Sequence, residues 1–263
     1  MLKSLICNDN PYQQNQNFID TNDNIDVVYK NSEKLYSNHS GKQKIEVFKN
    51  KFFGNILTLD DEIQITQYDE SNYHEMITHL PLNYIPNATK ILILGGGDGG
   101  VIKQALKHPN LKEITVVDND AELINIVKKY FPEFSNSFNN KKVKMIVENE
   151  TEWINKNSNE SFDLIIADSI DLNSNQIYLK IKKILKKNGI FVFNALIPSL
   201  EKNQIKILLK DMNKIFKYVK LYQIFQPSIA TGHYSFCFCS RSIDPKNNPI
   251  DWEKFNNKKI KTN

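Results

Sequence analysis

The residues at positions 91–100 combine an apolar strand with a glycine loop that holds one acidic side chain. They read Ile-Leu-Ile-Leu-Gly-Gly-Gly-Asp-Gly-Gly, and Gly95, Gly97 and Gly100 satisfy the nucleotide-binding pattern G-x-G-x-x-G. In dinucleotide sites of this pattern, the loop amides and the next helix N-terminus face a pyrophosphate. The carboxylate of Asp98 would repel that anion by roughly several kcal/mol in a site without water. We therefore expect a ligand that has an adenosine but carries positive charge, such as S-adenosylmethionine or its decarboxylated form.

Acidic side chains follow the first four strands of the predicted parallel sheet. In strand order they are Asp98, Asp118, the segment Glu148-Asn149-Glu150, and the pair Asp168 and Asp171. In an open α/β sheet, ligands bind at the carboxyl ends of the strands, near the point where the strand order reverses. Three acids there would form a strongly negative pocket in a chain whose net charge is +4. Such a pocket attracts a polycation.

These side chains have alternative interpretations. Asp118 can accept hydrogen bonds from both hydroxyls of a ribose, or it can cap the predicted helix at 121–130. Asp168 and Asp171 can hold a polycation, cap the next helix, or bind Mg²⁺ or Ca²⁺ as in a catechol-type methyltransferase. Asn149 can read the edge of an adenine.

After Pro86 the sequence alternates between apolar strands and amphipathic helices. We expect strands at 90–94, 113–118, 142–147, 162–167 and 189–194, with helices at 99–107, 121–130, 151–155, 177–187 and 200–215. Two more strands, at 218–225 and 234–240, have only turn residues between them and should pair antiparallel. Five parallel strands with crossovers and a terminal hairpin predict an α/β fold, a Rossmann-like doubly wound sheet of the methyltransferase type.

The chain before this sheet has a β pattern and ends in a helix. Strands are expected at 26–29, 43–48, 55–59 and 62–66, and the helix at 69–82. The predicted domains are a flexible or irregular leader at 1–24, a small N-terminal antiparallel β-domain with its helix at 25–82, a nucleotide-binding catalytic domain at 83–244, and a polar tail at 245–263.

The composition limits the classes of partner. With 263 residues, 40% of them hydrophobic, the chain can bury one good core or one domain plus a small companion. Its lysines occur in scattered pairs, typical of solvated helix faces, and Arg241 is its only arginine, which argues against phosphate recognition. Three cysteines without a second cluster predict neither a metal site nor a disulfide framework. There is no signal-peptide pattern and no apolar run of membrane-spanning length, so we expect a cytoplasmic protein that binds neither nucleic acid nor membrane.

Two further segments are highly specific in combination with the glycine loop. Tyr-His-Glu-Met at 73–76 lies on the helix before the sheet, and Leu-Asp-Asp-Glu-Ile-Gln-Ile-Thr at 59–66 precedes it. Together with 93–100 and 168–171, they resemble the spermidine synthase (polyamine aminopropyltransferase) family over most of the chain. The resemblance implies transfer of an aminopropyl group from decarboxylated S-adenosylmethionine, a co-substrate, to an amine such as putrescine. The products would be spermidine and methylthioadenosine. Edge strands of the N-terminal hairpins could pair between subunits, and we expect a homodimer or homotetramer.

The resemblance also assigns roles by family position. Asp168 would accept the proton that the attacking amine must lose, and would orient that amine. Asp98 would hold the aminopropyl ammonium and Asp118 the ribose. The other donor contacts would come from Gln43, Gly95, Gly97, Asn149 and Glu150, and the amine side would be lined by Gln64, Tyr73, His74, Asp98 and Asp171. No metal ion is expected.

Departures from the family pattern concentrate on the amine side. After Asp171 the family usually has P-x-G-P-A or similar and a longer segment, which 172–178 lacks. The family's P-T-Y-P reads Pro-Ser-Ile-Ala at 227–230, with Ile229 in place of the tyrosine, and its Asp-Gly after the third strand reads Asn149-Glu150. The acceptor amine therefore stays open. One alternative is a diamine N-methyltransferase that uses intact S-adenosylmethionine, whose carboxylate Asp98 would repel. Another is a catalytically silent member that acts as a binding or regulatory subunit.

Overall fold

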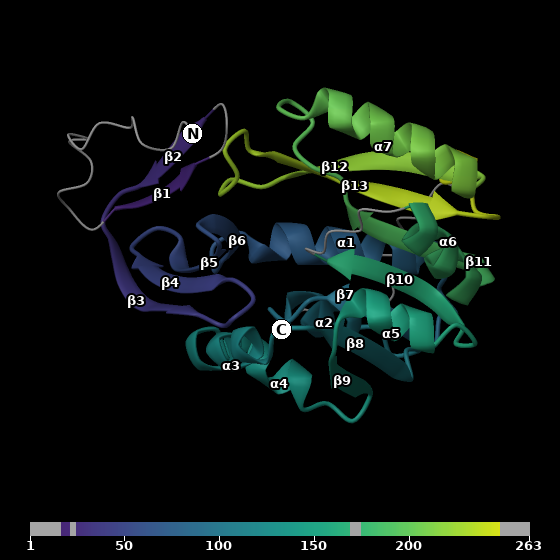
Figure 1. The fold of residues 1–263 in the computed structure, drawn as a ribbon, viewed down its shortest axis with the longest axis horizontal. Coiled ribbons are helices and arrows are strands. Elements are labelled where there is room, and N and C mark those ends of the chain that lie inside the picture. The colour runs from purple at the N-terminus through teal and green to yellow at the C-terminus, as the bar shows by residue number, and fades with distance from the viewer. Residues whose placement is uncertain (1–16, 22–24, 169–174, 248–263) are drawn as a thin grey trace. The chain divides into compact units, whose positions relative to one another are not determined.

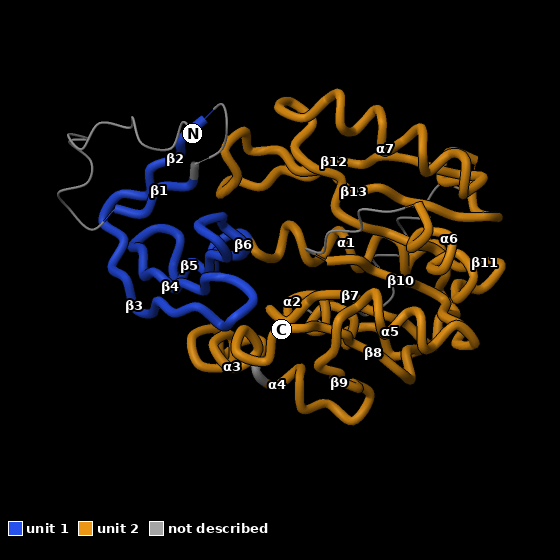
Figure 2. The backbone as a smooth tube through the Cα atoms, in the orientation of Figure 1, with its two compact units in different colours: residues 1–69 blue, residues 70–263 orange. Residues whose placement is uncertain are grey.

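The computed structural model describes residues 17–21, 25–168 and 175–247, and the chain divides into two compact units, Met1–Asp69 and Glu70–Asn263 (Figure 2). The division falls before the first helix, α1 (Glu70–Tyr84), whereas we expected it at residue 82. The reason is that α1 packs against helices and strands of unit 2. Its seven buried residues include Ile77 and Leu82.

The described part of unit 1 consists of two antiparallel sheets (Figure 1). A two-stranded sheet pairs β1 (Phe18–Thr21) with β2 (Asp26–Tyr29). A four-stranded sheet has the order β3 (Ser32–His39), β4 (Lys44–Asn50), β5 (Gly54–Leu59), β6 (Glu62–Thr66). Asp60 and Asp61 join β5 to β6 with φ values of 50° and 70°, the left-handed conformations that a tight two-residue hairpin turn requires.

Two strands of unit 1 differ from the sequence prediction. β1 lies within the segment expected to be an irregular leader, and Phe18 packs on Tyr29 and Phe48 in a small apolar core. β3 was not expected at all. It is an edge strand with mostly exposed or half-buried side chains, so its sequence has no apolar alternation to reveal it.

Unit 2 is built on a seven-stranded sheet with the order β12-β13-β11-β10-β7-β8-β9. The strands are β7 (Lys90–Gly95), β8 (Glu113–Asp118), β9 (Val143–Val147), β10 (Phe162–Asp168), β11 (Leu185–Asn194), β12 (Tyr218–Phe225) and β13 (His233–Ser240). β7 to β11 are parallel, and β13 pairs antiparallel with both β11 and β12. The predicted Rossmann-like sheet with a terminal hairpin is confirmed.

Helices cover both faces of this sheet. The helices after α1 are α2 (Gly100–Ala105), α3 (Ala121–Tyr130), α4 (Pro132–Phe138), α5 (Glu150–Lys156), α6 (Asn175–Ile184) and α7 (Lys202–Ile215). Residues of α5, α6 and α7 share one core with Leu92, Phe191 and Cys237. Tyr73 of α1 packs on Phe236, which alternates with Cys237 along β13 and so faces the other side. With both faces covered, β7 is buried, which explains its unbroken apolar sequence.

No helix in the described segments is long and apolar enough to cross a membrane.

Candidate active site

Three carboxyl groups meet where the strand order of unit 2 reverses, between β7 and β10. Asp98 lies in the glycine loop after β7, Asp118 ends β8, and Asp168 ends β10 opposite Gly95. The three groups are close enough to interact, since Asp98 raises the pKa of both Asp118 and Asp168, and Asp118 also raises that of Asp168. This edge is where an open α/β sheet binds its ligand.

Asp118 is fixed by the backbone around it. Its Oδ2 accepts a hydrogen bond from the Gly97 amide at 2.8 Å, and its Oδ1 accepts one from the Asp120 amide at 2.9 Å. A side chain at Gly97 would place its Cβ 2.6 Å from that Oδ2, so only glycine lets the loop approach this carboxylate. The cap of α3 is Asp120, which accepts from the Glu122 and Leu123 amides. The alternative in which Asp118 itself caps the helix is therefore wrong.

Burial raises the pKa of Asp118 to about 6, and Glu150 and Asp98 add to the shift. The carboxylate is ionised at neutral pH and can accept hydrogen bonds from two hydroxyl groups.

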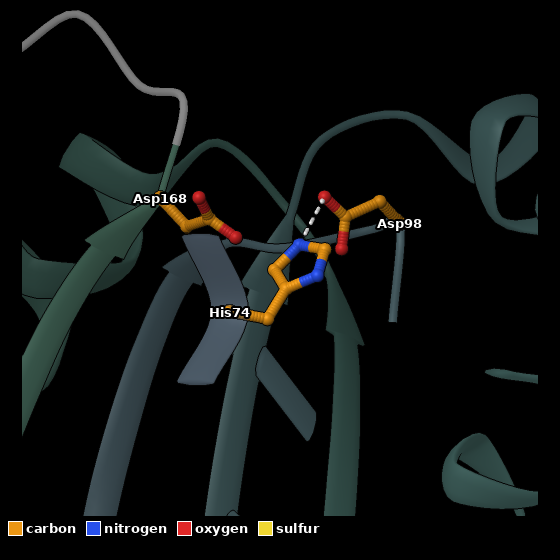
Figure 3. Close-up of side chains that lie close together, drawn as sticks. All are labelled: His74, Asp98 and Asp168. Carbon is orange, nitrogen blue, oxygen red and sulfur yellow. Dashed lines mark ion pairs between the residues drawn. The ribbon is translucent and has the colours of Figure 1, made fainter. Parts of the chain in front are cut away.

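His74 lies between the carboxyl groups of Asp98 and Asp168 (Figure 3). Its Nε2 is 3.5 Å from Asp98 Oδ2, and its Nδ1 is 2.6 Å from Glu70 Oε2, one turn earlier on α1. Asp98 is held in turn by the Gly100 amide, which donates to Oδ1 at 2.8 Å. Burial alone would lower the pKa of His74, but Asp98 and Glu70 outweigh it and raise that pKa to about 10. His74 is an imidazolium at neutral pH.

The third glycine of the fingerprint packs against this histidine. A Cβ at Gly100 would lie 2.1 Å from His74 Cε1 and 2.2 Å from Nδ1. The start of α2 and the imidazole ring can approach this closely only because position 100 has no side chain. The same glycines that would admit a phosphate in a nucleotide-binding loop here leave space for the Asp118 carboxylate, at Gly97, and the His74 imidazole, at Gly100.

Asp168 is almost completely buried, and its two oxygens differ. Oδ1 accepts a hydrogen bond from the Tyr73 hydroxyl at 2.8 Å, while Oδ2 has no hydrogen-bond partner. Burial and the charge of Asp98 raise the pKa of Asp168 to about 7, against the opposing effects of His74 and Tyr73. A carboxyl group with one free oxygen and a pKa near neutrality is suited to accept a proton.

Tyr73 connects this carboxyl group to the aromatic face of the sheet. Its ring packs on Phe236 at 4.9 Å and on Tyr234 at 5.8 Å between centroids. Burial and the Asp168 charge raise its pKa well above the ordinary value, so the hydroxyl stays protonated and donates to Asp168.

His74, Asp98 and Asp168 place one potential ligand atom each within 4.8 Å of the others, which raises the question of a metal. Both ring nitrogens of His74 face carboxylates and carry protons, so neither has a lone pair for a cation. In the described part of the chain, the cluster therefore fits an ion-pair network better than a metal centre.

Comparison with known proteins identifies the family. A model described as the spermine/spermidine synthase domain matches residues 70–249, and one described as the spermidine synthase tetramerisation domain matches residues 16–67. The chain belongs to the spermine/spermidine synthase family. The two matches meet where the two compact units divide, between residues 67 and 70.

Individual members agree with this assignment. Polyamine aminopropyltransferases of Buchnera aphidicola and Thermotoga petrophila are 33% and 32% identical to the chain, cover 82% and 90% of it, and align over 78% and 83% of their own length. The crystal structure of spermidine synthase from Thermotoga maritima matches with a TM-score of 0.88 and 30% identity, over 95% of this chain and 87% of that one. A spermidine synthase in complex with the transition-state analogue AdoDATO has the same TM-score and identity, over 95% and 86%. This member of the spermidine synthase family is a transferase.

The remaining residues that the family resemblance singled out are placed as follows. Asn149 and Glu150 lie where β9 leads into α5, and the Asn149 side chain caps that helix, its Oδ1 accepting from the Glu152 amide at 3.1 Å. Glu150 is buried and raises the pKa of Asp118, so a second acidic side chain lies near that carboxyl group. Gln43 and Gln64 belong to unit 1, and for them the assignment stays a prediction. Asp171 lies outside the described residues.

Two charged residues of the site were missed from the sequence. Glu70 bonds His74, and Lys103 of α2 bonds Glu70 Oε1 at 3.0 Å. The spacing of Glu70 and His74, four positions apart on one helix, was the available signal for the first contact. Nothing in the sequence pairs Lys103 with Glu70, because the pairing depends on how α1 packs on α2.

Proposed function

We propose that this chain transfers the aminopropyl group of decarboxylated S-adenosylmethionine to a diamine, with putrescine as the first acceptor to test, and releases methylthioadenosine. The observation that carries the proposal is Asp168. It is a buried carboxyl group at the strand-order reversal, with one oxygen bonded to Tyr73 and the other without a partner. An attacking amine needs such a proton acceptor, because an ammonium has no lone pair.

The charges around the site support a cationic donor. Within the described segments, Glu70, Asp98, Asp118 and Asp168 have His74 and Lys103 as neighbouring cations, so acids outnumber bases by four to two among these groups. Decarboxylated S-adenosylmethionine brings a sulfonium and an ammonium. Asp98 has 14% of its side chain exposed and is suited to receive that ammonium.

The chemistry is a displacement at the carbon next to sulfur. The amine nitrogen forms a bond to that carbon as the carbon–sulfur bond breaks, and sulfur keeps the electron pair and becomes neutral. The leaving group therefore needs no acid. Before the attack, the acceptor ammonium gives one proton to Asp168, whose free Oδ2 is the proposed acceptor. The nitrogen is positively charged again once the new bond has formed. Holding the amine in line with the breaking bond supplies the rest of the rate enhancement.

The same residues argue against two alternative functions. A diamine N-methyltransferase would bind intact S-adenosylmethionine, whose carboxylate would meet Asp98 in a site that already has an excess of acids. A catalytically silent member would have no need for a buried carboxyl group with a free oxygen, which is costly to maintain.

The test is a turnover assay on the purified protein. With decarboxylated S-adenosylmethionine and putrescine, we expect release of methylthioadenosine, detected by chromatography and mass spectrometry. Asp168→Asn should lower turnover by about 10³-fold, within the range known for loss of a general base. The matched control is Asp163→Asn on the same strand, because Asp163 bonds the Thr89 and Lys90 amides away from the strand end. No methylthioadenosine with any of several diamines and triamines would refute the proposal.

We also propose that unit 1 assembles the chain into a homodimer or homotetramer. The matching family model is described as a tetramerisation domain. Phe52 and Tyr68 of unit 1 are 63% and 53% exposed with rings 4.6 Å apart, an apolar pair of the kind that subunit contacts cover. Sedimentation velocity should give two or four subunits, and Phe52→Ser with Tyr68→Ser should lower that number. A monomer at micromolar concentration would refute this part.

A further inference from the structure

Four side chains of alternating charge form three successive ion pairs, which begin on α2 and end at Asp98 in the active site. Lys103 Nζ lies 3.0 Å from Glu70 Oε1, Glu70 Oε2 lies 2.6 Å from His74 Nδ1, and His74 Nε2 lies 3.5 Å from Asp98 Oδ2. Glu70 and His74 are both buried, and neither belongs to the sheet edge that receives the substrates. Burial opposes ionisation of Glu70, but His74 and Lys103 hold its pKa below the usual range.

The geometry fixes the protonation of His74. A neutral imidazole has one N–H and one lone pair, and the lone pair would point at a carboxylate here. Only the imidazolium donates at both nitrogens. The ring cannot turn away easily, since it lies against Gly100 and, edge to face, 6.1 Å from Phe134.

The groups that face this ring come from every element packed against it. They are Glu70 and Tyr73 on α1, Asp98 in the glycine loop, Asp168 on β10, Phe134 on α4, and Lys103 on α2 by way of Glu70. The His74 cation opposes the effect that burial and Asp98 have on Asp168. Without that cation, Asp168 would hold its proton to higher pH and could not accept another.

We propose that Glu70 is a positioning residue, which holds His74 as an imidazolium and thereby keeps Asp98 oriented and Asp168 ionised during aminopropyl transfer. The inference rests on the proposed function for its last step only. Glu70 touches neither the donor nor the acceptor in this account. It acts through His74, and Lys103 balances its charge.

The same pair of helices supplies a matched control. Glu75, five positions later on α1, pairs at 3.8 Å with Lys107, in the turn after α2, and its side chain is 48% exposed. Both ion pairs join α1 to α2 or to the turn that follows it, but of the two glutamates only Glu70 contacts His74. If the role of Glu70 were purely structural, substitutions at Glu70 and at Glu75 would differ only in their effect on the free energy of unfolding. They would not differ in their effect on the protonation of His74.

The first experiment reads His74 directly and needs no substrate. In the unliganded protein with ¹⁵N-labelled histidine, the five imidazoles are titrated by NMR, and the His74 signals are assigned by their loss in His74→Phe. We expect His74 to stay doubly protonated to at least pH 9. In Glu70→Gln its midpoint should fall by about three to four units, to below pH 7, which lies within the tails known for buried groups. In Glu75→Gln it should fall by less than about 0.3. A neutral His74 at pH 8 in the wild type, or an equal midpoint in Glu70→Gln, would overturn the proposal.

The second experiment links this charge to turnover. The ratio of kcat for Glu70→Gln to kcat for the wild type is measured from pH 6 to pH 9.5. It should be about 0.03 at pH 7 and recover severalfold as pH rises and Asp168 ionises, whereas Glu75→Gln stays within about twofold throughout. A ratio that is flat with pH would leave Glu70 a structural residue and overturn its positioning role.

If Glu70→Gln does not fold, Glu70→Asp retains the charge one methylene further away. Its His74 midpoint should lie between that of the wild type and the one expected for Glu70→Gln. If the wild type shows no aminopropyl transfer, the proposed function fails, while the NMR titration still decides whether Glu70 holds His74 charged.

Discussion

Two buried histidines lie five positions apart on α1 and differ in charge at neutral pH: His74 is positively charged and His79 is neutral. His74, at the active-site end, has a carboxylate at each ring nitrogen, and its pKa is raised to about 10. His79, toward the other end, bonds His108 at 2.8 Å and Gln104 at 3.2 Å, and burial with the charge of Lys107 lowers its pKa to about 4. Both side chains are withdrawn from solvent to a similar degree.

The difference shows that the partners of a buried histidine, more than its burial, decide whether it is charged. Around His79 the partners are an amide and a second imidazole, which can satisfy a neutral ring, the ordinary arrangement of a core histidine. Around His74 the partners are acids that serve a cationic ligand in the proposed reaction. A buried ion pair costs desolvation free energy, so its presence at one end of the helix marks the end that has a function.

The largest expected effect comes from the same substitution at both positions. His74→Phe keeps an aromatic ring but leaves Glu70 and Asp98 without their shared cation. We expect a loss of about 3–5 kcal/mol in unfolding free energy and a fall in turnover of about 100-fold or more at pH 7. His79→Phe should cost about 1–3 kcal/mol from the bonds it breaks and leave kcat within about twofold of the wild type. Chemical denaturation and the methylthioadenosine assay measure both quantities. Equal kinetic effects would contradict the distinction between the two ends.

A pair of glycine substitutions should give the next largest effect. Gly100→Ala places a Cβ against the His74 ring, and Gly189→Ala places one 2.8 Å from Leu185 Cδ1, remote from the three carboxyl groups. Each should cost about 1–3 kcal/mol in stability through overpacking. Only Gly100→Ala should also lower kcat, by about 30-fold if the displaced ring costs roughly 2 kcal/mol in transition-state stabilisation. A loss of kcat in Gly189→Ala equal to that in Gly100→Ala would show that general loosening, and not the His74 contact, is responsible.

The Tyr73 hydroxyl should contribute a smaller, specific effect. Tyr73→Phe removes the bond to Asp168 Oδ1, which raises the pKa of that carboxyl group further and lowers kcat at pH 7 by about tenfold. Tyr222→Phe is the control, because the Tyr222 hydroxyl donates to the Met76 carbonyl and its ring packs on the same Phe236. We expect Tyr222→Phe to keep the wild-type pH–rate profile. An unshifted profile in Tyr73→Phe would remove Tyr73 from the account.

The smallest effects, taken per pH unit, are opposite slopes of stability against pH. The pKa of His79 is lowered in the folded state, so its contribution is present above pH 6.5 and is lost as the pH falls toward 4. The pKa of His74 is raised, so its contribution is present below pH 6.5 and is lost as the pH rises toward 10.

The difference in unfolding free energy between wild type and His79→Phe should therefore shrink on acidification. The difference between wild type and His74→Phe should shrink on alkalinisation. Each changes by at most about 1.4 kcal/mol per pH unit. Denaturant titrations across pH 4–10 measure both slopes, and slopes of the same sign would contradict the opposite charge states.

The sheet of unit 2 could be predicted from the sequence because its parallel strands are buried on both faces and so have long apolar runs. The short helix α4 was missed, although Phe131, Phe134 and Phe138 are buried and Pro132 begins it, because its other residues are polar and its length gives no period. The edge strand β3 was missed because exposure removes the alternation on which prediction depends.

The site could be predicted where it depends on strand ends and not where it depends on helix packing. Asp98, Asp118 and Asp168 converge because carboxyl ends of parallel strands share one edge. The choice between Asp118 and Asp120 as the cap of α3 needed the structure, since both precede the helix. The link from Lys103 through Glu70 to His74 crosses two helices. Lysine and glutamate are usually exposed, so the sequence alone gives no sign that these two are paired inside the protein.

The central claim is that Asp98 selects a donor with an ammonium tail and no carboxylate. Titration calorimetry with decarboxylated and intact S-adenosylmethionine, on wild type and on Asp98→Asn, tests it most directly. We predict that the wild type binds the decarboxylated donor about 100-fold more tightly or better, corresponding to roughly 2.7 kcal/mol. In Asp98→Asn that preference should fall to about tenfold or less, because the variant no longer repels the carboxylate. Equal or tighter binding of intact S-adenosylmethionine by the wild type would contradict the account.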